Sequence, residues 1–452
     1  MSSDSAALMT RGPIYKQIIS FALPLFWGQL FQQLYNIVDS IVVGNYVGRD
    51  ALAAVSSSSS FVQLLVGLFV GIFMGAGVVI SKYFGAMDEE RVHRAIHSSV
   101  AFGITAGAIL TAVGLVFTPQ LLRWMETPEE VLAQAILYLR IYFAGALFLA
   151  LFNTAGGIFQ AVGDSKHPLY YLIFSSVLNV GLDLLFVAVL DMGIAGAAWA
   201  TVISQGAGAF LAFSRLHSTD GICRVEFKKV RFDRAIIREI LRTGLPSGVQ
   251  NSVISFANVV VQANINTFGP AAVAGYGASC KIEGFVFIPI TSFAMAMTTY
   301  ISQNLGAKKY GRAKRGAAFG IVICCLIAEL VGLAYYFFAP FLVSLFNSEP
   351  EVIALGTQHA QIIAFFFFLL AFSHVTAGIM RGAGRAVVPM LVMFGCWCVI
   401  RVAYIVIVTK YINDIRVVYW AYPITWTLGS FFFIYGLLGT DWIHGLERNG
   451  RR

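Results

Sequence analysis

The stretch ISKYFGA at residues 80–86 returns as ISQNLGA at residues 301–307, with four of its seven positions unchanged. The same offset of 221 residues aligns further pairs on both sides, without a gap, over roughly 120 residues. These pairs include Arg91 with Arg312, Pro119 with Pro340, Gly163 with Gly384 and Pro168 with Pro389. Leu23-Pro24 and Leu245-Pro246 match at an offset one residue longer. The repeat indicates that one long unit has been duplicated.

The composition predicts that lipid is the solvent for most of this chain. It is 58% hydrophobic and 12% charged, whereas soluble domains carry about 25% charged residues. Segments of about 20 apolar residues are long enough to cross a bilayer as helices. We expect twelve such spans, near residues 17–43, 56–80, 95–117, 131–160, 168–190, 193–214, 241–267, 278–302, 316–339, 352–380, 387–409 and 417–438.

These spans predict an all-α integral membrane protein built from two pseudo-symmetric six-helix lobes. We expect an N-lobe over residues 1–214, a basic cytoplasmic linker over 215–240, and a C-lobe with a basic tail over 241–452. Because six is even, both lobes enter the membrane in the same direction, so a pseudo-twofold axis along the membrane normal should relate them. A duplicated bundle of this size is typical of transporters.

The distribution of charge predicts the orientation. The formal net charge is +8, but the basic residues cluster at one end of the spans and in the linker. The loops expected outside hold only Arg49, Arg123, Lys410 and Arg416. This is the positive-inside pattern, which predicts a multi-pass protein of the plasma (inner) membrane with both termini cytoplasmic. It also argues against a nucleic-acid partner.

Polar side chains within the expected spans are the candidates for function, because an ionisable group in lipid is costly. Asp183 follows Asn179 by four residues, so the two share one helix face. Asp39 and Thr201 fall at similar depths on other spans, and Asn153 lies near them. Oxygen ligands of this kind suit Na⁺ or a shuttled proton. The alternative for each acid is a helix cap or a water-facing position near the interface, and for Thr201 a bond within its own helix.

The repeat provides a control for this assignment. At the 221-residue offset, Asn179, Asp183 and Thr201 correspond to Ile400, Tyr404 and Tyr422. The scaffold is therefore duplicated, whereas the acid–amide cluster is not. We expect the ion site in the N-lobe alone.

The expected C-lobe offers weaker candidates. Glu283 is a candidate for binding a cationic substrate or a proton. His374, which corresponds to Asn153, has an imidazole that titrates near neutral pH when unperturbed, although a lone buried His is more often structural. The abundant Phe and Met side chains suit a chamber for amphipathic small molecules.

Several stretches together resemble the multidrug and toxic compound extrusion (MATE) transporters, over nearly the whole chain. They are Gln32 to Asp39, Val42-Val43-Gly44, Leu52 to Val55, Gln160 to Ser165, and Asn179 to Asp183. The resemblance implies a V-shaped two-lobe fold and antiport of drugs against Na⁺ or H⁺. In the prokaryotic DinF-like branch the N-lobe cation site uses residues that match Asp39, Asn179, Asp183 and Thr201, with Asn153 nearby.

The resemblance also matches Pro24 to a bend in the first helix that is linked to the cation state. One feature departs from the family. The NorM-like branch carries a glutamate soon after the second Leu-Pro, but residues 248–256 contain no acid. A C-lobe cation site of that type is not predicted.

The alternative function is a flippase for lipid-linked precursors or polysaccharides, within the same broader superfamily. Such a protein needs a basic cavity, and Arg140, Lys281 and Arg401 are too few and too scattered to favour one. Nucleotide-binding motifs are absent from the sequence, so we expect a transporter rather than an enzyme, driven by an ion gradient. We expect no cofactor beyond the coupling ion, H⁺ or Na⁺, and a protein that works as a monomer in the bilayer.

Overall fold

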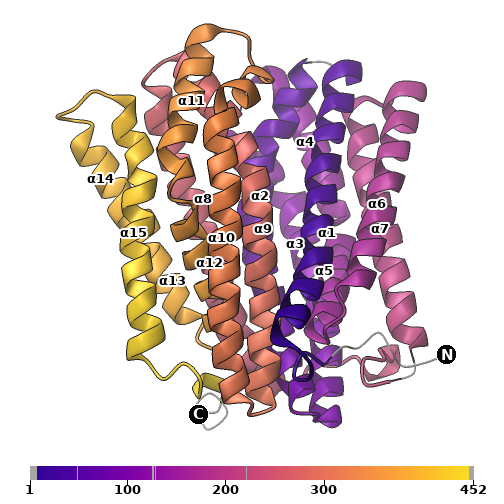
Figure 1. Ribbon diagram of the computed structural model, residues 1–452. Helices are drawn as coiled ribbons and strands as arrows, with labels where there is room; N and C mark the ends of the chain where they lie inside the picture. Colours follow the sequence, from indigo (N-terminus) through magenta and orange to yellow (C-terminus); the bar gives the residue numbers. More distant parts are fainter. Residues whose placement is uncertain (1–7, 48, 125–126, 128, 220, 447–452) are drawn as a thin grey trace. The chain divides into compact units, whose positions relative to one another are not determined.

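The computed structural model describes residues 8–47, 49–124, 127, 129–219 and 221–446, without the side chains at 44–45 and 49–66. Within these ranges the regular structure is helical (Figure 1). The first half contains α1 (Ile14–Val42), α2 (Arg49–Gly85), α3 (Glu89–Trp124), α4 (Glu129–Ala144), α5 (Ala146–Ala161), α6 (Lys166–Asp183) and α7 (Gly193–Ser218). The second half contains α8 (Arg234–Asn266), α9 (Pro270–Gly306), α10 (Tyr310–Ser344), α11 (Pro350–Ala364), α12 (Phe367–Gly382), α13 (Val387–Met393), α14 (Arg401–Val408) and α15 (Ile415–Gly439). Short π-helical turns are η1 (Val43–Val47), η2 (Leu184–Val189) and η4 (Phe394–Ile400), and η3 (Phe227–Lys229) is a 3₁₀ turn.

The helices follow the predicted spans closely. Among the described residues, eight helical segments are long and apolar enough to cross a membrane, or ten if each bent pair counts as one span. The expected first and seventh spans appear as α1 and α8, which are long but less apolar. Both contain a Leu-Pro pair, so the two helices correspond to each other in the repeat.

Two expected spans are each split into two helices. α4 and α5 meet at an angle of 48°, and α11 and α12 at 58°. The first bend lies at Gly145, where an added Cβ would come within 2.4 Å of the Val202 side chain on α7. Glycine therefore lets α7 approach the bend. The position 221 residues later is Phe366, so the bend is repeated although the residue is not.

The chain divides into two compact units, with boundaries near Pro24 and at Pro246. One unit contains Leu23–Leu245, and the other contains Met9–Ala22 together with the chain from Pro246 onward. Two of the boundaries fall at a Leu-Pro pair inside a helix, in α1 and in α8, and the third lies between Leu8 and Met9. A proline within a helix removes one backbone hydrogen bond and permits a kink. The two helices within which the chain passes between units therefore each contain a proline that permits a kink.

The N-terminal segment of the second unit is held by backbone contacts. The Met9 amide donates to Gln303 Oε1 at 2.9 Å, and Asn304 Nδ2 donates to the Met9 carbonyl at 3.3 Å. Lys309 Nζ donates to the Thr10 carbonyl at 2.9 Å. These side chains stand at the end of α9 and directly after it. The contacts explain why the chain before Ala22 belongs with the second half.

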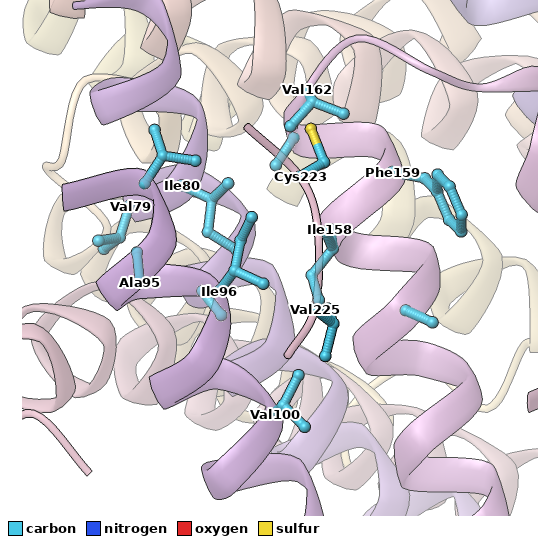
Figure 2. Packing of buried hydrophobic residues seen from close by; sticks show 14 of the residues in the cluster. Val79, Ile80, Ala95, Ile96, Val100, Ile158, Phe159, Val162, Cys223 and Val225 are labelled. Atoms are coloured by element: carbon cyan, nitrogen blue, oxygen red, sulfur yellow. The ribbon is translucent and has the colours of Figure 1, made fainter. Parts of the chain in front are cut away.

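The linker between the repeats is packed into the first unit. Val225 is fully buried, and Figure 2 shows it with Cys223 among side chains of α2, α3 and α5, including Ile96 and Ile158. The Val225 amide donates to the Leu216 carbonyl at 3.0 Å. Burying a valine stabilises a protein by about 1.5–3 kcal/mol. The linker is therefore anchored to the N-terminal repeat.

Charged contacts fix the end of this linker. Arg94 Nε donates to Asp233 Oδ2 at 2.7 Å, and the arginine lowers the pKa of Asp233 below its ordinary value. Asp233 Oδ1 accepts bonds from the amides of Ala235 and Ile236, which open α8. Asp233 thus caps the helix and pairs with α3.

Candidate functional site

Asp183 lies where α6 changes its helical winding. It is the last α-helical residue before the π-helical turn η2, and such turns are frequent at functional sites. Its side chain is fully buried, and Asn179, one turn earlier, is only 1% exposed. A buried carboxyl group on an apolar helix must find partners or hold a proton.

Asp39 from α1 meets this carboxyl group. The two side chains are close enough to act on each other electrostatically. Two carboxyl groups this close in a poorly solvated place favour a single shared proton over two negative charges. The pair therefore brings α1 and α6 together through a group that can gain or lose a proton.

Asn179 connects the acids to a third helix. With its amide oriented to satisfy its neighbours, its nitrogen donates to Asp183 Oδ2 at 3.2 Å. Its oxygen accepts from the Thr201 backbone amide, on α7, at 3.3 Å. The four residues expected to form one site are therefore adjacent in space.

Two oxygens of this cluster have no partner. Asp39 Oδ1 and Asp183 Oδ1 are both buried and make no hydrogen bond. Unsatisfied buried acceptors are costly, so each can accept a proton or ligate a cation. Carboxylate, amide and hydroxyl oxygens are the ligands that hard cations prefer. The residues present fit a proton or a hard cation.

Two of the expected residues bond within their own helices. Thr201 Oγ1 donates to the Ala197 carbonyl at 3.1 Å, which leaves its lone pairs free for a ligand. Asn153 Nδ2 donates to the Leu149 carbonyl at 2.9 Å and contacts neither acid among the described hydrogen bonds. The structure thus brings Thr201 to the cluster through its backbone and leaves Asn153 outside it.

Two tyrosines lie near the acids and a third lies beside those two; none was predicted from the sequence. Tyr35 and Tyr138 are both close to the two acids. Tyr142 interacts with Tyr35, and its ring stacks on that of Tyr138 at 6.4 Å between centroids. Tyr35 precedes Asp39 by four residues, as Tyr138 precedes Tyr142. This helical spacing was the signal available in the sequence.

The second-unit candidates have different neighbours. Glu283 on α9 interacts electrostatically with Arg401. His374 on α12 packs edge-on against Phe287 at 4.7 Å and beside Trp397 at 5.4 Å, and its Nε2 has no hydrogen-bond partner. Arg401 also packs on Trp397, so the two residues share a neighbourhood without a described contact between their side chains. Pro24 stands in α1 at the boundary between the units.

Comparison with known proteins gives a family that covers both repeats. The sequence model of the MatE family matches residues 24–185 and again residues 246–407. Both matches begin at the proline of a Leu-Pro pair. The internal repeat read from the sequence is thus a repeat of the family unit.

Individual relatives align over most of the chain. The probable multidrug resistance protein YpnP of Bacillus subtilis (strain 168) is 30% identical over 390 residues, which is 85% of this chain and 86% of that protein. The probable multidrug resistance protein YoeA of the same strain is 29% identical over 95% of this chain and 94% of its own length.

A solved structure has the same fold throughout. It is an outward-facing conformation of a multidrug resistance MATE family transporter of the MOP superfamily. Its TM-score is 0.91 at 25% identity, covering 99% of this chain and 100% of that one. The all-helical two-lobe fold and the repeat are thereby confirmed, and the chain belongs to the MatE family of multi-pass membrane transporters and is not an enzyme.

Proposed function

We propose that this transporter is an antiporter that exports amphipathic, often cationic, small molecules in exchange for H⁺ or Na⁺. The two Bacillus relatives are named as probable multidrug resistance proteins. Their names favour drug export over the flippase alternative. From the distribution of its basic residues we also propose that the chain lies in the inner membrane with both termini cytoplasmic, and that it works as a monomer.

The observation that carries this proposal is the acid pair. Asp39 and Asp183 are close neighbours, and each has one buried oxygen without a partner. Losing the shared proton leaves two negative charges close together in a poorly solvated place, which favours a different arrangement of α1 and α6 or the uptake of a cation. Ion occupancy therefore shifts the populations of two conformations, as alternating access requires.

In the second unit we propose separate roles for the two candidates. Glu283 partly balances the positive charge of the buried Arg401, on which it acts electrostatically. His374 packs between aromatic rings. Neither needs to bind the coupling ion.

The test is dye export from proteoliposomes under a proton gradient or a Na⁺ gradient, each imposed separately. Asp183→Asn removes the titratable group while keeping the size of the side chain. We expect it to reduce export to background at normal protein abundance. Asp191→Asn is the matched control: Asp191 is exposed, two residues beyond η2, with a φ of 52° that Asn also tolerates.

Export by Asp191→Asn should equal that of the wild type, under whichever gradient drives it. If Asp183→Asn exports dye at the wild-type rate, the acid pair is not the coupling site. If neither gradient drives the wild type, the antiport proposal fails.

A further inference from the structure

Arg401 is a buried cation at the centre of the second unit. It is the first residue of α14, directly after the π-helical turn η4, and is 2% exposed. Its Nε and Nη2 donate to Thr425 Oγ1 on α15 at 3.2 and 2.9 Å. A guanidinium remains charged in nearly every protein environment. A permanent positive charge therefore lies inside this bundle.

Aromatic rings, rather than a contacting carboxylate, surround the charge. Arg401 Cζ lies 4.4 Å from the centroid of the Tyr422 ring and 5.6 Å from that of Trp397. The Tyr422 hydroxyl is hydrogen-bonded to that of Tyr276 at 2.7 Å, which fixes the ring. Glu283 acts on the guanidinium electrostatically without a described ion pair. Cation–π contacts are stronger in a desolvated place than at an exposed one.

The internal repeat shows which residues of the first unit correspond to the surroundings of Arg401. At the 221-residue offset, Tyr422 corresponds to Thr201 and His359 to Tyr138. Thr201 and Tyr138 both border the Asp39–Asp183 pair. Their counterparts are also neighbours, with the rings of His359 and Tyr422 5.9 Å apart.

Arg401 itself corresponds to Val180, the neighbour of Asn179. Its guanidinium packs on Tyr422 and so lies in the second-unit counterpart of the acid–amide cluster, where Asn179 and Asp183 are replaced by Ile400 and Tyr404. At this place the second unit carries a cation of its own, and Glu283 is the acid that acts on it.

We propose that Arg401 is a tethered cation that permanently fills this counterpart site. Because the guanidinium stays charged, the charge at this place in the second unit does not change. The guanidinium also excludes a mobile cation, both by charge repulsion and by filling the space. Coupling then depends on the first unit alone. Only this last consequence rests on the proposed antiport; the occupancy of the site by the arginine does not.

The test is the thermal stability of purified protein in detergent, which requires no transport. Arg401→Ala should lower the melting temperature and create a space that a free guanidinium ion fits. Methylguanidinium at low millimolar concentration should then restore at least half of the lost melting temperature, whereas NaCl at equal ionic strength should not. The wild type and Arg401→Lys, which keep a tethered charge, should show no methylguanidinium effect.

Arg401→Met distinguishes the effect of losing the charge from the effect of losing side-chain volume. It also provides the test if Arg401→Ala does not fold. It keeps an unbranched side chain but removes the charge, so we expect a lower melting temperature than for Arg401→Lys. The proposal is overturned if Arg401→Met is as stable as the wild type, or if methylguanidinium stabilises Arg401→Ala no more than NaCl. Because these are binding and stability readouts, they hold even if the export assay fails.

Discussion

At the scale of single residues, two asparagines in the same unit have different partners. Asn179 spans from Asp183 to the backbone of α7, whereas Asn153 bonds only to the preceding turn of its own helix among the described contacts. Both are polar residues within apolar helices, and the sequence did not distinguish them. The difference arises from which face of each helix meets a neighbour, and periodicity alone does not specify that.

Substituting these two residues gives a matched comparison. Asn179→Ala removes a hydrogen bond to a charged or proton-sharing group, which is worth about 1.5–3 kcal/mol. We expect the concentration of driving ion needed for half-maximal export to rise about tenfold or more, since each 1.4 kcal/mol is a factor of ten. Asn153→Ala should leave that concentration unchanged. Equal shifts in both variants would show that Asn179 has no special link to the ion.

The tyrosines near the acid pair could not be predicted from the sequence alone. The cost of an ionisable group in lipid marks charged residues as candidates, whereas Tyr35 and Tyr138 carry no formal charge. Yet Tyr35 lies four residues before Asp39, on the same helix face. The acid and amide residues were thus predictable from cost and spacing, while their aromatic neighbours on α4 became visible only once the helices were packed.

At the scale of helices, Pro24 in α1 and Pro246 in α8 lie where the chain passes from one compact unit to the other. Pro24 leaves α1 without one backbone hydrogen bond, and Pro246 does the same in α8. If alternating access bends the chain where it passes between units, these helices should bend there first. The repeated Leu-Pro pair was visible in the sequence, but its position at the unit boundary was not.

Restoring the missing hydrogen bond should stiffen each helix. We expect Pro24→Ala and Pro246→Ala to raise the melting temperature and to slow export, because an interior proline costs a helix about 3 kcal/mol. The measurement is melting temperature alongside initial export rate in proteoliposomes. Faster export, or a lower melting temperature in both variants, would rule out a hinge at these positions.

Close helix packing gives a second prediction at this scale. A Cβ added to Gly75 in α2 would lie 2.4 Å from the backbone nitrogen of Gly244 in α8, an atom that cannot move aside alone. Gly75→Ala should therefore destabilise the protein by about 1–3 kcal/mol. In Gly77→Ala, two residues along the same helix, the nearest atom would be 3.8 Å away.

The control should be neutral or slightly more stable, since alanine is the better helix former. Thermal unfolding in detergent compares the two variants directly. If Gly75→Ala proves no less stable than Gly77→Ala, α2 and α8 do not pack as closely as described.

At the scale of the whole molecule, the linker joins the repeats as a packed element. Arg94 lowers the pKa of Asp233, so the ionised form stabilises the folded protein. That contribution is complete above the ordinary pKa of about 3.9 and is lost as the pH falls through the lower folded value. We expect Asp233→Asn to have a lower melting temperature than the wild type at neutral pH.

The difference between wild type and Asp233→Asn should stay constant from neutral pH to about pH 5 and shrink below about pH 4. Melting curves across this range measure it. Arg94→Gln removes the charge pair but leaves the bonds from the Ala235 and Ile236 amides to Asp233. In an Arg94→Gln background, the pH dependence of the effect of Asp233→Asn should therefore shrink without disappearing. A difference that persists unchanged at the acid end would mean that the carboxylate charge is not what holds the linker.

The repeat made the architecture predictable, whereas the details required coordinates. The 221-residue offset, the spacing of apolar spans and the paired Leu-Pro motifs indicated two lobes, and the family match over both repeats agrees. The bends at Gly145 and near Phe366 were not predicted, because both lie inside continuous apolar segments. The packing of Val225 into the first unit was likewise hidden in a polar stretch.

The most direct test of the account is ion displacement by substrate on purified protein. In weakly buffered detergent solution, adding a cationic dye to the wild type should release protons, or displace bound radioactive Na⁺ in the parallel assay. The same release should occur with Asp191→Asn, and none with Asp39→Asn or Asp183→Asn. Release of wild-type size from the Asp39→Asn/Asp183→Asn double variant would contradict the account, because the coupling ion would then be held elsewhere.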